Sequence, residues 1–372
     1  MTRRLDGFAI AAVSLVAIDA VTRLVVGGPY VGATFLLLAA CGLACVPLTP
    51  REMGTPSLQL AVLPALAVGS FSVLLTTVSI VGIRLTELSI RLAVTALVVA
   101  LVVVSTLVRS HASENARARP RPASWREAAA VAALIGLLVF SLASSSDIAY
   151  PFQARGTDWG HYLLYADEVE AQQRLLINDP LAGEADRVFA DPAAVGAVYG
   201  SFLTLDGVSS WPLAFGIVVV SALTVLSVYA AVGTLWGVGA GLAAAAMYAV
   251  APIRLDPMYW HGLGTTLALV FLPLVVLALG LMYRGRRDWR TVALLSASLL
   301  GVAASHATSA IVVAVLIVVA PLGDAAGSSP AASRPRTRCV RGRVTGWYDR
   351  SSPESRWRVS SALASSHIFD FR

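Results

Sequence analysis

Long apolar runs alternate with short polar segments along most of this chain. A helix that crosses the hydrocarbon core of a bilayer needs about 20 predominantly apolar residues. The sequence therefore predicts an all-α integral membrane protein, a polytopic bundle of about nine transmembrane helices. The predicted spans are residues 7–27, 31–47, 59–82, 88–108, 127–145, 210–232, 236–252, 263–283 and 291–320.

Arginines near the span ends indicate how the spans are oriented. Cytoplasmic loops of membrane proteins carry an excess of basic residues. If the spans alternate in direction from a cytoplasmic N-terminus, four separate groups of arginines all fall on the cytoplasmic side. These groups are Arg3 and Arg4; Arg51; Arg109, Arg117, Arg119, Arg121 and Arg126; and Arg284, Arg286, Arg287 and Arg290. We therefore expect a multi-pass protein of the cell membrane.

This topology divides the chain into four regions. Residues 1–110 hold four spans, 111–126 form a basic cytoplasmic linker, 127–320 form a second membrane region, and 321–372 form an Arg/Ser-rich tail. The tail differs abruptly in composition from the rest and has no apolar periodicity. Translation out of frame, which truncates a longer membrane protein, would produce such a tail. A native disordered basic segment is the alternative.

The segment 145–209 would form one large extracytoplasmic loop, and it holds ten of the 22 acidic residues. Within it lies the stretch "GTDWGHYLLYADEVE" (156–170). Read as a helix, this stretch puts Asp158, His161, Tyr165 and Glu168 on one face, at spacings of three and four. A solvated amphipathic helix at the membrane surface would give the same pattern, so periodicity alone leaves both readings open.

A second, shorter outer loop, "APIRLDPMYWHG" (251–262), brings Asp256, Trp260 and His261 to the same side. Aromatic rings beside an acid suit the face of a sugar. Aromatic residues at a span end also serve as interfacial anchors.

Composition supports the membrane interpretation and limits others. The mean hydropathy is +0.73 and only 13% of residues are charged, against about a quarter in soluble domains. The net charge of +6 follows the predicted topology, so we expect no nucleic-acid partner. Cys41 and Cys45 lie inside an apolar run and Cys339 in the tail, which indicates no disulfide framework.

Several ionisable residues fall in or beside predicted spans. Asp19 and Arg23 lie four residues apart and are expected to neutralise each other. Arg84 and Arg91 lie on the outer side, where guanidinium groups could hold a lipid phosphate or make ordinary head-group contacts.

Two further features of the spans concern helix packing. His306, in mid-span, would make a polar contact between helices or mark a break between two short ones. Gly233, Gly237 and Gly241 repeat every four residues, as close helix packing requires, and lack the strand context of a nucleotide-binding loop.

Four longer stretches resemble polytopic proteins of the GT-C membrane glycosyltransferase superfamily, in an actinobacterial-type branch. They are "ARGTDWGHYLLYADEVEAQQRLLINDP", "FADPAAVGAVYGSF", "YWHGLGTTLALVFLPLVVLALG" and "GVAASHATSAIVVAVLI". The resemblance covers roughly residues 127–320. It implies transfer of a sugar from a polyprenyl-phosphate donor, with an acid of an outer loop as catalytic base. The superfamily usually has this loop after its first span, whereas here it follows the fifth.

By position, Asp158 matches the loop acid, with Asp147 as the alternative. We expect Asp158 and His161 to be catalytic, and a cell-envelope glycan or lipid to accept the sugar. A divalent cation, Mg²⁺ or Mn²⁺, could be held by Asp158 with Asp191 or Asp256. The expected substrate-binding residues are Arg155, Tyr165, Asp256, Trp260, His261 and Arg84.

Two rival functions remain. Transporters and flippases concentrate charged groups near the midplane, on broken helices and in paired repeats, whereas this sequence concentrates them in one outer loop. An inactive membrane fragment is the third reading, if the tail is out of frame.

Overall fold

The computed structural model describes residues 7–111, 125–146, 158–178, 188–189, 193–207, 211–252, 255–256, 262–315 and 317. The chain divides into two units, 1–321 and 322–372, and all described residues belong to the first. Its helices are α1 (Gly7–Val26), α2 (Ala33–Cys45), the 3₁₀ turn η1 (Val46–Leu48), α3 (Pro56–Ile80), α4 (Glu87–His111), α5 (Trp125–Ser146), α6 (Asp158–Gln172), α7 (Ala193–Asp206), α8 (Trp211–Trp236), α9 (Val238–Val250), α11 (Leu263–Tyr283) and α12 (Trp289–Ser305). Two short antiparallel strands, β1 (Ile177–Asn178) and β2 (Val188–Phe189), complete the described elements.

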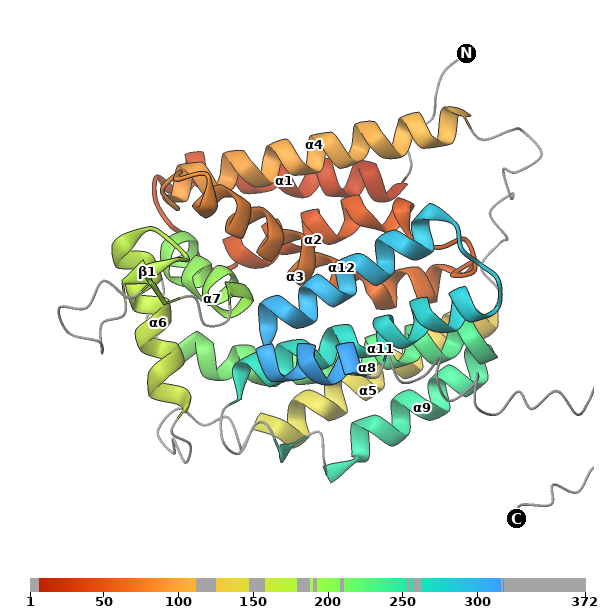
Figure 1. The fold of residues 1–372 in the computed structure, drawn as a ribbon. Coiled ribbons are helices and arrows are strands. Elements are labelled where there is room, and N and C mark those ends of the chain that lie inside the picture. The colour runs from red at the N-terminus through yellow and green to blue at the C-terminus, as the bar shows by residue number, and fades with distance from the viewer. Residues whose placement is uncertain are drawn as a thin grey trace, which may run out of the picture. The chain divides into compact units, whose positions relative to one another are not determined.

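The described part of the chain is a helical bundle with the character of a multi-pass membrane protein (Figure 1). Every predicted span contains a helix. Five helices, or described parts of them, are long and apolar enough to cross a membrane: Gly7–Val26, Pro56–Ile80, Glu87–Val108, Val219–Trp236 and Leu263–Tyr283. The apolar stretches of α2, α5, α9 and α12 are shorter than those of the five helices. The count of nine spans therefore remains a prediction.

The central helices of the bundle differ from the peripheral ones in burial. In the most apolar stretch of α3 and of α8, 61% of the residues are buried, against 17% in α1 and 22% in α4. Side chains of α8, α9, α11 and α12 lie in one hydrophobic core, those of α1, α2 and α4 lie in a second, and α3, α6 and α7 contribute residues to both. Because α1 and α4 expose rows of Val, Leu and Ile, these two helices offer apolar surface to lipid.

The helix α7 corrects the prediction that 145–209 is entirely an outer loop. All its residues except Ala193 and Thr204 are buried, and it packs against α2, α3, α6, α11 and α12. At 14 residues it is too short for a full span, and a helix buried on all sides has no polar stripe to reveal it. The sequence analysis therefore assigned these residues to the acidic loop and predicted no buried helix there.

The helix is interrupted at His306. A break between two short helices was one of the two predictions for this residue. His306 has an extended backbone (φ −162°, ψ 112°), and helical residues resume at 307. Its Nδ1 accepts a hydrogen bond from the backbone N–H of Ser309 (3.2 Å) and lies 2.8 Å from the hydroxyl of Ser309. The imidazole thus caps the helical residues that follow, which turn away from the direction of α12 (Figure 1).

Close packing of α8 against α9 confirms the prediction for the glycine repeat. A Cβ on Gly241 would lie 2.8 Å from the Cα of Gly233, and one on Gly233 would lie 2.7 Å from a methyl group of Leu58. Gly237 does not take part in this contact. It forms the turn between the two helices, with a positive φ of 97°. Only glycine adopts such a backbone at little cost.

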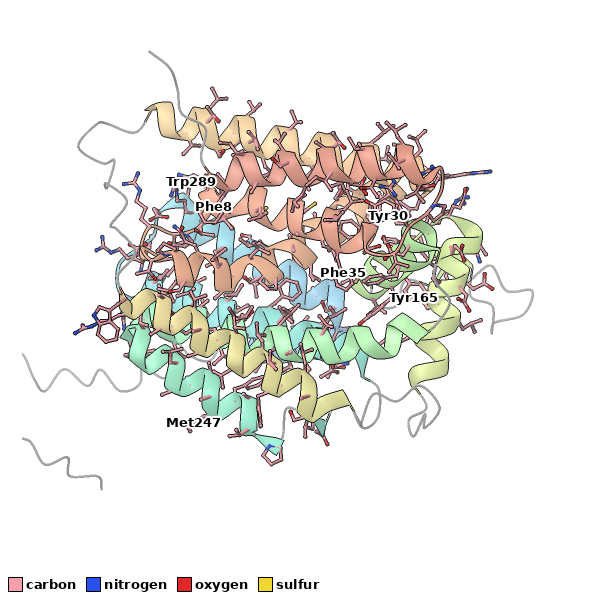
Figure 2. The ribbon with its side chains drawn as sticks, turned by 180° about the vertical axis from the view of Figure 1, so that it is seen from behind. Phe8, Tyr30, Phe35, Tyr165, Met247 and Trp289 are labelled. Carbon is pink, nitrogen blue, oxygen red and sulfur yellow. The ribbon has the colours of Figure 1, made fainter. Side chains whose placement is uncertain are left out.

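Loops predicted to share a side of the membrane contact one another, and they form two ends of the bundle. We call the first end the α6 end. There the backbone N–H of Tyr30 donates to the carbonyl of Leu205, and that of Leu85 donates to the carbonyl of Gln173 (3.3 and 2.7 Å). We call the second end the arginine end, where Arg286 pairs with Glu52 (3.3 Å). The labelled Tyr30 and Tyr165 lie at the opposite end of the helices from Trp289 (Figure 2). The contacts thus agree with the relative order of the spans, while the side on which the N-terminus lies remains a prediction.

Candidate functional site

The helix predicted from "GTDWGHYLLYADEVE" is present as α6, which begins at Asp158 and includes His161. The side chains of these two residues lie outside the described part of the structure. So do Asp147, Arg155, Asp191, Trp260 and His261. Asp256 is described and exposed.

Tyr165 does not lie where a substrate could reach it, which argues against the substrate-binding prediction. Its side chain is 1% exposed, and its hydroxyl donates to the carbonyl of Leu175 at 2.8 Å. The ring lies against Gly196 of α7, where a Cβ would approach its Cε1 to 2.7 Å. Tyr165, labelled in Figure 2, therefore holds α6 against α7.

A second contact of the same kind lies one turn further along both helices. A Cβ on Gly200 would approach Cγ1 of Val169 to 2.6 Å. Two glycines four apart on α7 thus receive two side chains four apart on α6, a spacing that puts each pair on one helix face. We call Tyr165, Val169, Gly196 and Gly200 the α6–α7 contact. It holds the acid-rich helix against a buried one.

The second half of α6 carries three acids within about one helical turn, and their surroundings differ. Glu168 accepts a hydrogen bond from the side-chain amide of Gln172 at 2.8 Å. Partial desolvation, together with the neighbouring charge of Glu168, raises the pKa of Asp167. Glu170 is exposed. These carboxylates give α6 a negative outer face at the α6 end.

A cluster of ionisable side chains links α1 to α4, which lie side by side in Figure 1. Arg91 pairs with Asp19 and with Glu87, the latter at 3.2 Å. Arg23 also binds Glu87, with Nη2 donating at 3.1 Å. The Tyr30 hydroxyl donates to Asp19, and the Arg91 guanidinium lies 5.4 Å from the Tyr30 ring centre. We call these five residues the α1–α4 cluster.

The cluster corrects two sequence-based expectations. Asp19 and Arg23 do not neutralise each other, because α4 lies beside α1 and offers each a partner of opposite charge. Arg91 is 9% exposed and engaged by two carboxylates, so it is not an outward ligand for a lipid phosphate. Arg84 is exposed and forms no ion pair with any described residue, so it is still available for that role.

Burial is the main reason that the pKa of Tyr30 is raised to about 12, and its hydrogen bond to Asp19 adds to this effect. The phenol therefore stays protonated at neutral pH and can donate to the carboxylate. With two acids and two arginines, the cluster is balanced in charge. Such balance lets ionised groups lie among apolar helices.

Sequence analysis missed the role of Asp206, which it counted only as one of the loop acids. Asp206 ends α7, and its buried carboxylate accepts from the backbone N–H groups of Gly32 and Thr34 (2.9 Å each) and from the Thr34 hydroxyl (2.8 Å). These N–H groups open α2, so a distant helix supplies the N-terminal cap. Gly207, with φ +62°, comes directly after Asp206, at the end of the apolar run 193–205, and this helix-stop pattern was the available signal.

Among the described residues, no group of three His, Cys, Asp or Glu side chains could hold a metal ion. The predicted cation ligands Asp158 and Asp191 have no described side chains, so the Mg²⁺ or Mn²⁺ site remains a prediction. Comparisons with known proteins leave the family open: no family model matches the chain, and neither does any curated protein or solved structure.

Proposed function

We propose that this protein is a GT-C-type membrane glycosyltransferase, which moves a sugar from a polyprenyl-phosphate donor to a cell-envelope glycan or lipid at the α6 end. The observation that carries the proposal is the α6–α7 contact, since it fixes an acid-rich helix to the helical bundle at this end. A reaction between a lipid-linked donor and a hydroxyl acceptor needs such a rigidly held acid at the membrane surface.

The chemistry assigns a role to each residue near the start of α6. Asp158 takes the acceptor proton as the hydroxyl oxygen attacks the anomeric carbon. The bond from that carbon to the phosphate oxygen breaks, and the phosphate leaves with the electron pair. His161 and Arg155 donate to the phosphate oxygens and stabilise this negative charge. Asp256 and Arg84 are the described residues proposed to contact substrate outside α6.

Asp158→Asn tests the proposal, because the amide has nearly the same shape but is a very weak base. Transfer from a labelled polyprenyl-phosphate sugar in proteoliposomes should fall by about 10²–10⁴-fold, the usual contribution of a general base. His161→Ala should reduce transfer less. Asp167→Asn, the same change nine residues further along α6, is the matched control and should stay within about three-fold of the unmodified protein.

Equal activity of Asp158→Asn and Asp167→Asn would exclude Asp158 as the base and make Asp147 the next candidate. Absence of transfer by the unmodified protein would exclude the glycosyltransferase. Full transfer in the presence of a strong chelator would exclude the divalent cation, which in the proposal screens the donor phosphate.

The break at His306 favours a second candidate, a transporter or flippase. Transporters use interrupted helices to expose backbone groups and charged side chains within the membrane, and here the break lies between two apolar helical stretches. The same proteoliposomes separate the two functions. A flippase would move the labelled lipid to the other leaflet without forming a glycosylated product.

A further inference from the structure

The end of the bundle opposite α6 carries an unusual concentration of arginines. Two segments far apart in sequence, 49–52 and 284–290, meet there. Arg286 pairs with Glu52 at 3.3 Å, and Arg290 Nη1 donates to the carbonyl of Thr49 at 3.3 Å. The arginine patch, as we define it, is Arg51, Arg284, Arg286, Arg287 and Arg290.

Negative charge in this patch is scarce and already engaged. Of the two acids in these segments, Glu52 pairs with Arg286. The carboxylate of Asp288 accepts from the N–H groups of Arg290 and Thr291 (2.9 and 3.0 Å) and caps α12. Arg51 and Arg287 are exposed and form no ion pair with any described residue. The patch therefore has a positive excess that no acid of the described chain neutralises.

Two exposed tryptophans mark the depth of this patch in a membrane. Trp236 is 64% exposed and Trp289 is 50% exposed. The Arg284 guanidinium lies 5.8 Å from the Trp236 ring centre, and that of Arg290 lies 5.5 Å from the Trp289 ring centre. Indole rings at helix ends settle at the level of the lipid head groups. The guanidinium groups stacked on them therefore lie at the level of the phosphates.

We propose that the arginine patch is a binding site for the head groups of anionic phospholipids in the leaflet at this end. Guanidinium groups bind phosphate oxygens through paired N–H donors, and the tryptophans supply apolar surface for the adjoining acyl chains. The α6 end carries no comparable excess, because acids of α6 and the charge-balanced α1–α4 cluster lie among its arginines. This site is independent of the proposed transfer reaction.

The test compares two variants with the same change in net charge. Arg51→Gln with Arg287→Gln removes the two unpaired arginines of the patch, while Arg174→Glu replaces one exposed arginine at the α6 end by an acid. Each purified protein is placed in nanodiscs of phosphatidylcholine with a minor fraction of phosphatidylglycerol. The phosphatidylglycerol that stays bound after transfer to detergent is then measured by native mass spectrometry.

The unmodified protein and Arg174→Glu should retain phosphatidylglycerol equally, and the Arg51/Arg287 glutamine variant should bind it about ten-fold or more weakly, since each surface arginine contributes a several-fold gain. Arg51→Lys with Arg287→Lys should retain most binding, because the charge remains. Equal loss in Arg174→Glu and in the double glutamine variant would overturn the proposal in favour of a net-charge effect. Displacement of the lipid by millimolar inorganic phosphate would also overturn it, by identifying a free-anion site.

Discussion

Two carboxylates show how single side chains connect distant parts of this chain. Asp19 binds Arg91 of α4 and Tyr30 of the following loop. Asp206 binds three donors at the start of α2, although more than 170 residues separate them. A buried acceptor with several donors is costly to remove, because each donor then loses both water and its partner.

Asp206→Ala should lower the free energy of unfolding by about 2–3 kcal/mol, since three donors at the start of α2 lose their acceptor. Thr204→Ala on the same helix is the matched control. Thr204 is half-buried and makes no side-chain hydrogen bond with a described residue, so its effect should be under about 1 kcal/mol. Unfolding of the purified protein in mild detergent measures both, and equal effects would contradict the capping role.

At the level of secondary-structure elements, the pair α6 and α7 determines how the acidic segment is held. The helix α7 offers glycines at 196 and 200, and α6 fills the space with Tyr165 and Val169. Small residues four apart allow two helices to approach closely. The position of the start of α6, where Asp158 lies, therefore depends on this contact.

Gly200→Ala should destabilise the protein by about 1–3 kcal/mol, the usual cost of an extra methyl group in a packed interior. The new Cβ would lie 2.6 Å from Cγ1 of Val169. Adding Val169→Ala removes that atom and should restore much of the lost stability. Gly136→Ala serves as the control, because a Cβ on Gly136 meets nothing within 4 Å and alanine favours helix. A Gly200→Ala protein as stable as Gly136→Ala would contradict the close contact.

On the scale of the whole molecule, the two ends of the bundle differ in chemistry. The α6 end collects acids, and the arginine end collects unpaired arginines and exposed tryptophans. Because basic loops tend to stay in the cytoplasm, this difference predicts a single orientation in the membrane.

A reporter fused after residue 118 should therefore be active in the cytoplasm, and one fused within 175–190 should be active outside it. Fusions of an enzyme that works only in one compartment measure both positions. The contacts at each end predict further that a reporter after Arg287 behaves like the one after residue 118. The opposite pattern at either site would overturn the orientation and move the proposed reaction to the cytoplasmic face.

The sequence by itself determined the apolar helices, the helix α6 and a close helix packing at the glycine repeat. These features depend on local periodicity, and an apolar run as long as a membrane is thick has few alternatives to a helix. The glycine repeat also predicted close helix packing, although Gly233 and Gly241 belong to α8 and α9 and Gly237 forms the turn between them. Arginine counts at the span ends also predicted which loops would meet.

Only the tertiary structure decided the partners of the charged residues and the burial of α7. Asp19 has Arg23 one turn away in sequence, yet it pairs with Arg91, because ion pairs form with whichever helix packs alongside. Tyr165 shares a helical face with acids but is buried, because α7 covers it. A helix buried on every side has no amphipathic pattern, so the sequence could indicate where α7 ends but not that other helices cover it on every side.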